Sequence, residues 1–204
     1  MEKQRGLNTR QRFVKRIFDL FFSFIGLILF AIPILILIIF AFFSTGKFGV
    51  FSQKRVGQNA RLFTIYKIRT MKEKIPDEDF ITLKNDDRIT SFGKFLRLFK
   101  LDELPQLFNV LIGDMSLVGP RPDVPGYADR LTGDDKIILT VKPGITGPAT
   151  IKFKDEEDLL SKQKDPKKYN DEIIWKEKIK INKEYLSNWT FWNDIKCILN
   201  TIFA

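Results

Sequence analysis

Two adjacent carboxylates, Asp102 and Glu103, are the residues of this 204-residue chain best placed to do chemistry. Basic residues flank them on both sides, with Arg97 and Lys100 before them and Arg121 after a loop. Carboxylates held among cations in this way suit an enzyme that acts on phosphate groups with the help of a divalent metal ion. They are therefore the first candidates for a catalytic site.

A helix is expected to begin near Asp102, because Pro105 is tolerated only in a first helical turn, and to end at Gly113. At that start the Asp102 carboxylate would meet the positive end of the helix dipole, stay ionised, and be available as a nucleophile or metal ligand. The alternative is an ordinary N-cap aspartate followed by a first-turn glutamate, which is a frequent arrangement. For these two residues taken alone, that structural interpretation is favoured.

Few other residues could carry the chemistry, since the chain has no histidine and one cysteine. The composition excludes Ser-His triads, histidine-bound zinc and imidazole acid–base catalysis. The single Cys197 excludes an internal disulfide and a cysteine metal cluster, and it favours a reducing, cytoplasm-facing location. Neither a Gly-x-Gly-x-x-Gly after a strand nor a P-loop is present, so Rossmann and P-loop nucleotide sites are not supported.

The net charge of +9 predicts an anionic partner, which could be nucleic acid, anionic lipid or a phosphorylated substrate. The 20 phenylalanines, with Lys and Arg scattered among them, favour a membrane interface over a nucleic-acid groove. Lys67, Arg97 and Arg121 could converge on phosphate oxygens. Taken singly, each is better explained as solvated basic surface or as a contact to lipid headgroups. Lys67 and Arg69 would share one face of a strand.

Residues 20–43 carry no charge and are mostly Phe, Ile and Leu. At ~1.5 Å per residue they form roughly 36 Å of helix, enough for a hydrocarbon core of about 30 Å. No small-residue cleavage site follows the segment, so a signal peptide is disfavoured. Pro33 would kink or break the helix, and basic residues crowd both flanks, as expected if both ends lie on the cytoplasmic face. A re-entrant helix-break-helix and a single span both remain open on these grounds.

The rest of the chain predicts a small hairpin followed by helices. Residues 50–56 and 62–71 are rich in β-branched and aromatic residues, with a turn at 57–60, and residues 72–90 form a charged loop. A helix is expected at 91–99, rigid Gly-Pro turns at 119–122 and 142–148, and helices at the membrane surface over 165–203. The acidic clusters at 77–79, 86–87, 134–135 and 155–158 are interpreted as solvated.

Together these segments resemble the bacterial sugar transferase family of monotopic phosphoglycosyl transferases, which begin the assembly of O-antigen, capsule, exopolysaccharide and glycoprotein glycans. The resemblance covers nearly the whole chain, in the family's order. Its motifs are Lys-Arg-Ile-Phe-Asp (15–19), Phe-Ser-Gln-Lys-Arg-Val-Gly (51–57), Phe-Thr-Ile-Tyr-Lys-Ile-Arg-Thr-Met (63–71), Leu-Asp-Glu-Leu-Pro-Gln-Leu-Phe-Asn-Val-Leu (101–111), Gly-Asp-Met-Ser (113–116), Gly-Pro-Arg-Pro (119–122) and Lys-Pro-Gly-Ile-Thr-Gly (142–147).

The resemblance implies a mainly helical α+β fold, with a small β-hairpin and amphipathic interfacial helices around a compact catalytic domain. Residues 1–45 would form a basic segment and a re-entrant membrane helix, and residues 46–204 the cytoplasm-facing catalytic domain. The expected location is the cytoplasmic face of the bacterial inner (plasma) membrane, with monotopic insertion. The expected partners are a UDP-sugar, polyprenol phosphate and the lipid bilayer, with downstream glycosyltransferases as further candidates and no nucleic acid.

The resemblance also implies a reaction, the transfer of a sugar 1-phosphate from a UDP-sugar to polyprenol (undecaprenyl) phosphate, with release of UMP. Asp102 would attack the β-phosphate and form a covalent phosphosugar intermediate, which the lipid phosphate then resolves. Glu103 would hold Mg²⁺. The residues implied to contact phosphates or the nucleotide are Lys67, Arg69, Arg97, Arg121, Gly144 and Thr146.

Two positions depart from the family pattern. Ile32 stands before Pro33 where members usually have serine, which leaves the angle of the membrane break open. Pro148-Ala-Thr150 follows the Gly-Ile-Thr-Gly motif where many members have Leu-Ala-Gln, so the identity of the sugar stays open. The sequence also does not fix the glycan pathway or the oligomeric state. The alternatives are a non-catalytic protein of the membrane surface and a Mg²⁺-dependent phosphatase of polyprenyl phosphates.

Overall fold

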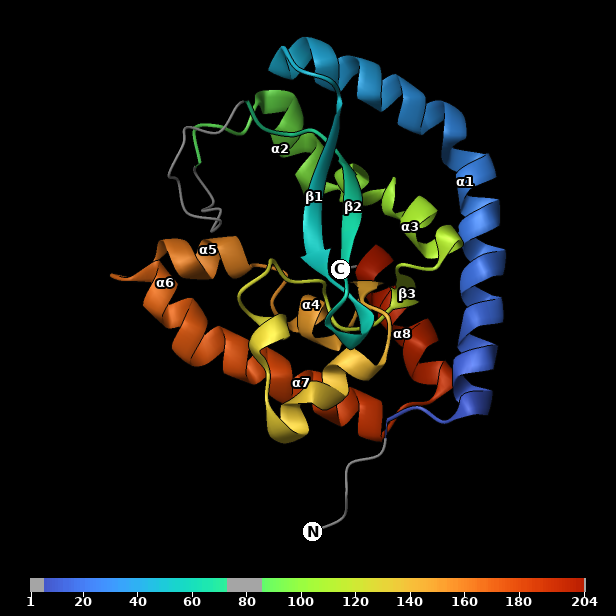
Figure 1. Ribbon diagram of the computed structural model, residues 1–204. Helices are drawn as coiled ribbons and strands as arrows, with labels where there is room; N and C mark the ends of the chain where they lie inside the picture. Colours follow the sequence, from blue (N-terminus) through green and yellow to red (C-terminus); the bar gives the residue numbers. More distant parts are fainter. Residues whose placement is uncertain (1–5, 73–85, 204) are drawn as a thin grey trace.

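The protein is built around a long N-terminal helix and a short hairpin, as the computed structural model describes it for residues 6–72 and 86–203. Helix α1 (Thr9–Thr45) runs along one side of the molecule and bends over its top, above the hairpin of β1 (Val50–Val56) and β2 (Leu62–Ile68) (Figure 1). The remaining elements are α2 (Ser91–Leu98), α3 (Gln106–Ile112), β3 (Ser116–Val118), β4 (Gly144–Thr146), α4 (Pro148–Lys152), α5 (Glu156–Ser161), α6 (Pro166–Tyr169), α7 (Trp175–Ser187) and α8 (Phe191–Ile202). The mainly helical α+β class, the hairpin and the C-terminal helices are confirmed.

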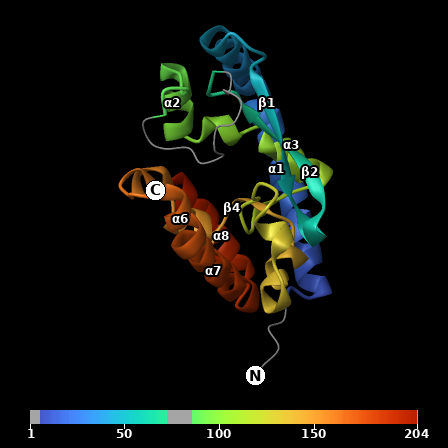
Figure 2. The same cartoon turned by 60° about the vertical axis from the view of Figure 1, so that its left-hand side comes forward.

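The largest core lies between two sides of the molecule. Figure 2 shows α1 and the hairpin on one side and α6, α7 and α8 on the other. Buried side chains from the hairpin, β3 and the last two helices meet there, among them Val56, Val118, Leu186 and Cys197. This core fixes the hairpin relative to the C-terminal helices, so residues far apart in the sequence keep a defined geometry.

Helix α1 is helical through Pro33, so the expected interruption is a bend and not a gap. Asn8 begins the helix with a capping box. The Asn8 side chain accepts a hydrogen bond from the backbone N–H of Gln11, and the Gln11 side chain accepts one from the backbone N–H of Asn8. Gly46, in the left-handed region at φ 70°, ends it. Pro33 removes one backbone hydrogen bond inside the helix and is the cause that we assign to the bend (Figure 1). Among the helices of the described residues, α1 is the one whose length and composition would allow it to cross a membrane.

Polar residues on the inner face of α1 attach it to the rest of the protein. The Arg16 guanidinium donates to the carbonyls of Val110 at 2.7 Å and Leu111 at 2.9 Å, where α3 ends. A cation at that end satisfies free carbonyls and complements the helix dipole. The Asp19 carboxylate accepts from the Leu117 N–H of β3 at 2.9 Å. The Lys-Arg-Ile-Phe-Asp motif therefore docks the apolar helix onto α3 and β3.

Both ends of α1 contact the same folded unit. Near the start, Lys15 donates to Asp194 of α8 at 2.5 Å, and both side chains are buried. Tyr185 of α7 also donates to Asp194, at 2.6 Å, so the carboxylate is fully hydrogen-bonded. Near the end, the Ser44 hydroxyl donates to the Thr90 hydroxyl at 2.8 Å, just before α2. Helix α1 is therefore attached near both of its ends to the same folded unit, with its apolar middle between the two attachment points.

The segment before α3 differs from the prediction. Asp102 and Glu103 lie in a 3-10 turn, Leu101–Glu103, and the α-helix begins only at Gln106. The expected helix start near Asp102 is wrong, because Lys100 takes a left-handed conformation at φ 54° and the chain makes one tight turn first. Pro105 stands at the N-cap of α3, where a missing N–H costs nothing. Gly113, at φ 97°, ends α3 as expected.

A second sheet, of two short parallel strands, was not predicted. β3 pairs with β4, and the latter lies inside the segment 142–148 that was expected to be a turn. The backbones approach so closely that a Cβ on Gly144 would lie 2.1 Å from the nitrogen of Gly119. Only glycine fits there, so the glycines of these two motifs serve the contact between the two segments.

Asn109 connects α3 to the hairpin and gives a test of this packing. Its side chain is fully buried, accepts from the Tyr66 N–H at 3.1 Å and donates to the Thr64 carbonyl at 2.7 Å. We expect Asn109→Ala to lower the free energy of unfolding by about 2 kcal/mol, because two buried backbone groups lose their partners. Denaturant unfolding of the detergent-solubilised protein measures this. Asn200→Ala, on the exposed face of α8, is the control and should have little effect.

Candidate active site

Glu103 is the residue that assembles the site. Its Oε1 accepts a hydrogen bond from Lys67 Nζ of β2 at 2.7 Å and another from Arg121 Nη2 of the loop after β3, also at 2.7 Å. Burial alone would raise the pKa of the Glu103 carboxyl, but Arg121 and Lys67 together hold that pKa well below its usual range. Glu103 is therefore a permanent anion that fixes two cations beside its neighbour.

Asp102 is buried beside the same cations but is not paired with them. Its side chain is 8% exposed, and within the described residues it makes no hydrogen bond or ion pair. Burial raises its pKa above the ordinary value, while Lys67, Arg97 and Arg121 act in the opposite direction. The expectation that a helix dipole keeps Asp102 ionised is wrong, because the residue lies in the 3-10 turn before α3. The nearby cations lower its pKa, but burial outweighs them and the net shift is upward.

Arg97 reaches the site from α2. Its Nε donates to the Thr70 hydroxyl at 3.1 Å, and its Nη1 donates to Glu157 Oε1 of α5 at 2.9 Å. The guanidinium acts electrostatically on Asp102, whose pKa it lowers. The sequence offered the convergence of three cations only as a possibility. The structure gathers them around the carboxylate pair, namely Lys67, Arg97 and Arg121.

Gly144 and Thr146, predicted to contact the nucleotide, serve within the structure to hold the loop of Arg121. The Gly144 N–H donates to the Pro120 carbonyl at 2.8 Å, and the Thr146 carbonyl accepts from the Gly119 N–H at 2.8 Å. The Thr146 hydroxyl is buried and shares a hydrogen bond with that of Thr201. Their direct contact with a nucleotide stays a prediction.

Arg69 is turned away from the carboxylate pair. Its guanidinium donates to the carbonyls of Phe48 at 2.8 Å and Val50 at 3.4 Å, and it lies 5.7 Å from the centre of the Phe51 ring. The structure therefore ties Arg69 to β1 and does not bring it to Glu103. Its contact with phosphate also stays a prediction.

Two residues that the sequence analysis did not single out lie beside Arg121. Burial and the charge of Arg121 lower the pKa of Arg55 to about 10, and its Nη1 donates to the Pro122 carbonyl at 3.3 Å. Burial raises the pKa of Asp123 to about 6 in spite of the nearby Lys178 and Arg55. Arg55 could have been found from the sequence, because it belongs to the Phe-Ser-Gln-Lys-Arg-Val-Gly motif. Asp123 lies outside the motifs, and no sequence pattern marks it.

The acidic segment 155–158 is the main error in the sequence-based site. It was interpreted as solvated, and Asp155 and Glu157 are indeed exposed. What the interpretation missed is that Glu157 pairs with Arg97 and that Glu156 pairs with Lys178 of α7, whose Nζ lies 2.7 and 2.8 Å from the two carboxylate oxygens. Partners 60 and 22 residues away in the chain give no local signal.

The other acidic clusters have simpler outcomes. Asp86 pairs with Arg88, and Asp135 pairs with Lys183 at 2.7 Å. The cluster 77–79 lies outside the described residues.

The carboxylate pair fits a magnesium ion only if substrate completes the coordination. Over residues 6–72 and 86–203, no group of three His, Cys, Asp or Glu side chains could hold a metal ion by itself. Magnesium commonly takes one or two carboxylates together with substrate phosphates and waters. Both cations contact Oε1 of Glu103, which leaves Oε2 of Glu103 and the Asp102 carboxylate for such an ion.

Comparison with known proteins gives consistent matches over almost the whole chain. The family described as bacterial sugar transferase matches residues 10–204. The undecaprenyl-phosphate galactose phosphotransferase of Salmonella typhimurium is 39% identical over 97% of this chain and 42% of its own length. A UDP-glucose:undecaprenyl-phosphate glucose-1-phosphate transferase of Klebsiella pneumoniae is 38% identical, over 97% and 41%. The uncharacterized sugar transferase EpsL of Bacillus subtilis is 35% identical, over 93% and 85%. The chain thus spans about two fifths of the first two relatives and most of the third.

The opposite pKa shifts of the two carboxyls predict opposite effects on stability. The ionised form of Asp102 is disfavoured by folding at any pH above its raised pKa, so Asp102→Asn should stabilise the protein by about 1 kcal/mol at pH 7.5. Glu103→Gln should destabilise it by about 2 kcal/mol, because Lys67 and Arg121 lose the anion between them. Melting temperatures at pH 7.5 measure both. A shift of both variants in the same direction would contradict the assignment.

Proposed function

The chain belongs to the bacterial sugar transferase family, and we propose that it transfers a sugar 1-phosphate from a UDP-sugar to polyprenol (undecaprenyl) phosphate, releasing UMP. The observation that carries this proposal is the buried, unpaired Asp102 among Lys67, Arg97 and Arg121, with Glu103 held apart by two of these cations. A nucleophile for a diphosphate must be free of partners, yet positive charge around it must offset the repulsion between anions. The product would be the substrate for glycosyltransferases that extend the glycan.

In the first step an Asp102 oxygen attacks the β-phosphorus of the UDP-sugar. The bond between that phosphorus and the bridging oxygen breaks, and UMP leaves with the bridging oxygen and its electron pair. The sugar phosphate is then an acyl phosphate on Asp102. The ionised form of Asp102 is the nucleophile and UMP leaves as an anion, so this step needs no general base. This agrees with a site that contains no histidine.

In the second step an oxygen of the polyprenyl phosphate attacks the same phosphorus, and the bond to Asp102 breaks. The Asp102 carboxylate is regenerated and polyprenyl diphosphosugar is formed. Arg97, Lys67 and Arg121 neutralise the phosphate oxygens in both steps, and Glu103 keeps the last two in place. Magnesium, held by Glu103 and shared with the phosphates, would supply further charge neutralisation.

Helix α1 supports a re-entrant, monotopic attachment. Its two ends contact one domain through Lys15 with Asp194 and through Ser44 with Thr90, and a rigid domain does not extend through a bilayer. The exposed side chains of the helix between them are apolar. Phe95 and Leu98 of α2, and Phe99 directly after it, are also exposed and would lie on the same lipid surface. In this arrangement Asp102 faces the cytoplasm at the level of the headgroups, where lipid and nucleotide substrates meet.

The intermediate can be trapped by omitting the lipid acceptor. We expect the protein with UDP-sugar and Mg²⁺ to release about one UMP per molecule and to gain the mass of one phosphosugar, because the second step is blocked. Asp102→Asn should give neither result in UMP assays and intact mass spectrometry. Asp134→Asn, on the exposed surface, is the control.

Retention of full activity by Asp102→Asn would refute the nucleophile assignment. Release of inorganic phosphate from polyprenyl phosphate, without UMP, would instead identify a phosphatase.

Single cysteines can decide the topology. In a Cys197→Ser background, Thr9→Cys and Lys47→Cys place one thiol at each end of α1. We expect a membrane-impermeant maleimide to label both in inside-out vesicles and neither in right-side-out vesicles, because both ends rest on one domain. Labelling of the two thiols from opposite faces would show a single span.

A further inference from the structure

The acidic segment 155–158, which the sequence analysis set aside, lies beside Arg97 of the proposed site. Two ion pairs hold α5 against the domain, Glu157 with Arg97 at 2.9 Å and Glu156 with Lys178 at 2.7 Å. Lys178 also lies 5.9 Å from the centre of the Phe153 ring, just after α4. The segment from α4 to α5 is thus anchored at several points, and one of its anchors is a cation of the proposed site.

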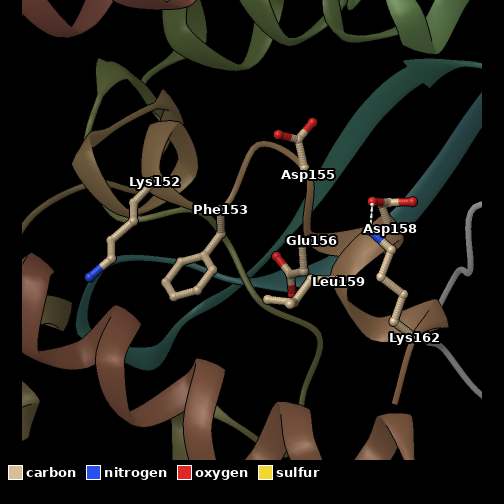
Figure 3. A pocket seen from close by; sticks show the side chains of 7 residues that line it. All are labelled: Lys152, Phe153, Asp155, Glu156, Asp158, Leu159 and Lys162. Atoms are coloured by element: carbon tan, nitrogen blue, oxygen red, sulfur yellow. Dashed lines mark hydrogen bonds and ion pairs between the residues drawn. The ribbon is translucent and has the colours of Figure 1, made fainter.

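A cavity of about 250 Å³ opens along this segment. Figure 3 shows Lys152 on one side of it, Asp158 and Lys162 as a pair on the other, and Phe153 and Glu156 between them. Asp155 and Leu159 complete the lining. The lining thus carries three carboxylates and two ammonium groups around Phe153 and Leu159. The volume is below that of the pockets that hold drug-sized ligands, so the cavity suits one small polar group.

The position of the cavity relates it to the phosphate site. Glu156 lines the cavity, and the next residue, Glu157, contacts Arg97. The Glu156 charge also contributes to the raised pKa of Arg121, whose main cause is Glu103. Glu156 thus links the lining of the cavity to the surroundings of Arg121. A sugar in the cavity would have its phosphate on the Glu156 side, toward these cations.

We propose that this cavity receives the sugar of the nucleotide-sugar donor. An uncharged polyol fits its chemistry, because carboxylates accept hydrogen bonds from hydroxyls and Phe153 offers an apolar surface. The two lysines of the lining are engaged, Lys152 by Glu177 and Lys162 by Asp158. The three acidic side chains of the lining disfavour a phosphate, so the nucleotide lies elsewhere. The inference rests on the proposed function and adds to it the part of the chain that selects the sugar.

Asp155 is the carboxylate of the lining best suited to accept a hydrogen bond from a sugar hydroxyl. It is exposed, and its side chain makes no capping hydrogen bond to α5. The two other carboxylates of the lining are already engaged, Asp158 by Lys162 at 2.6 Å and Glu156 by Lys178. Asp155 can therefore accept hydrogen bonds without breaking an internal ion pair, and its removal should leave the fold intact.

The test compares Asp155→Ala with Asp134→Ala, a matched change on the exposed surface away from the cavity. The full-length protein in nanodiscs is assayed for kcat/KM with UDP-glucose, UDP-galactose and their 2-acetamido counterparts. The inhibition constant of UDP, which lacks the sugar, is measured in parallel. We expect Asp155→Ala to lower kcat/KM for the preferred donor by about tenfold and to reduce the ratio between donors. The inhibition constant of UDP should not change.

Three results would overturn the inference. They are unchanged kcat/KM values, an equal loss for all four donors, and a matching loss of UDP affinity, since each places the effect outside the sugar. If the unmodified protein released UMP from none of the donors, the proposed function itself would fail, and this inference with it.

Discussion

The site depends on one carboxylate that is shared by two cations. Glu103 holds Lys67 from the hairpin and Arg121 from the loop after β3, each at 2.7 Å, and so prevents either from pairing with Asp102. Without that anion, the two cations would repel each other or pair with the neighbouring carboxylate. Asp102 therefore stays without a partner, which is the condition that the proposed nucleophile needs.

The remaining elements keep that arrangement in place. Asn109 fixes α3 to β2, and the glycines of β4 let it approach the loop of Arg121 closely. Arg16 and Asp19 fasten the membrane helix to the end of α3 and to β3. The polar residues near the start of an otherwise apolar helix thus have a physical reason, since they hold the helix against α3 and β3.

Local patterns in the sequence predicted the elements well and their boundaries less well. The hairpin, α2, the end of α3 at Gly113 and the C-terminal helices follow from β-propensity, apolar spacing and turn chemistry. The start of α3 was misplaced, because the left-handed Lys100 gives no signal and the 3-10 turn has the composition of a helix. The β3–β4 pairing was missed because strands of three residues carry too little pattern.

The sequence by itself determined the family, the adjacent carboxylates proposed for the site and the apolar N-terminal helix, because these depend on residue types at short spacing. Only the tertiary structure decided that Glu103 and not Asp102 is paired, and that Arg69 turns away. It also decided that the acidic segment of α5 pairs with Arg97 and Lys178. These outcomes depend on ion pairs between residues 18, 36 and 60 positions apart, and on burial, which raises one carboxyl pKa while nearby cations lower the other. Burial and long-range pairing are properties of the packed chain and leave no trace in local sequence.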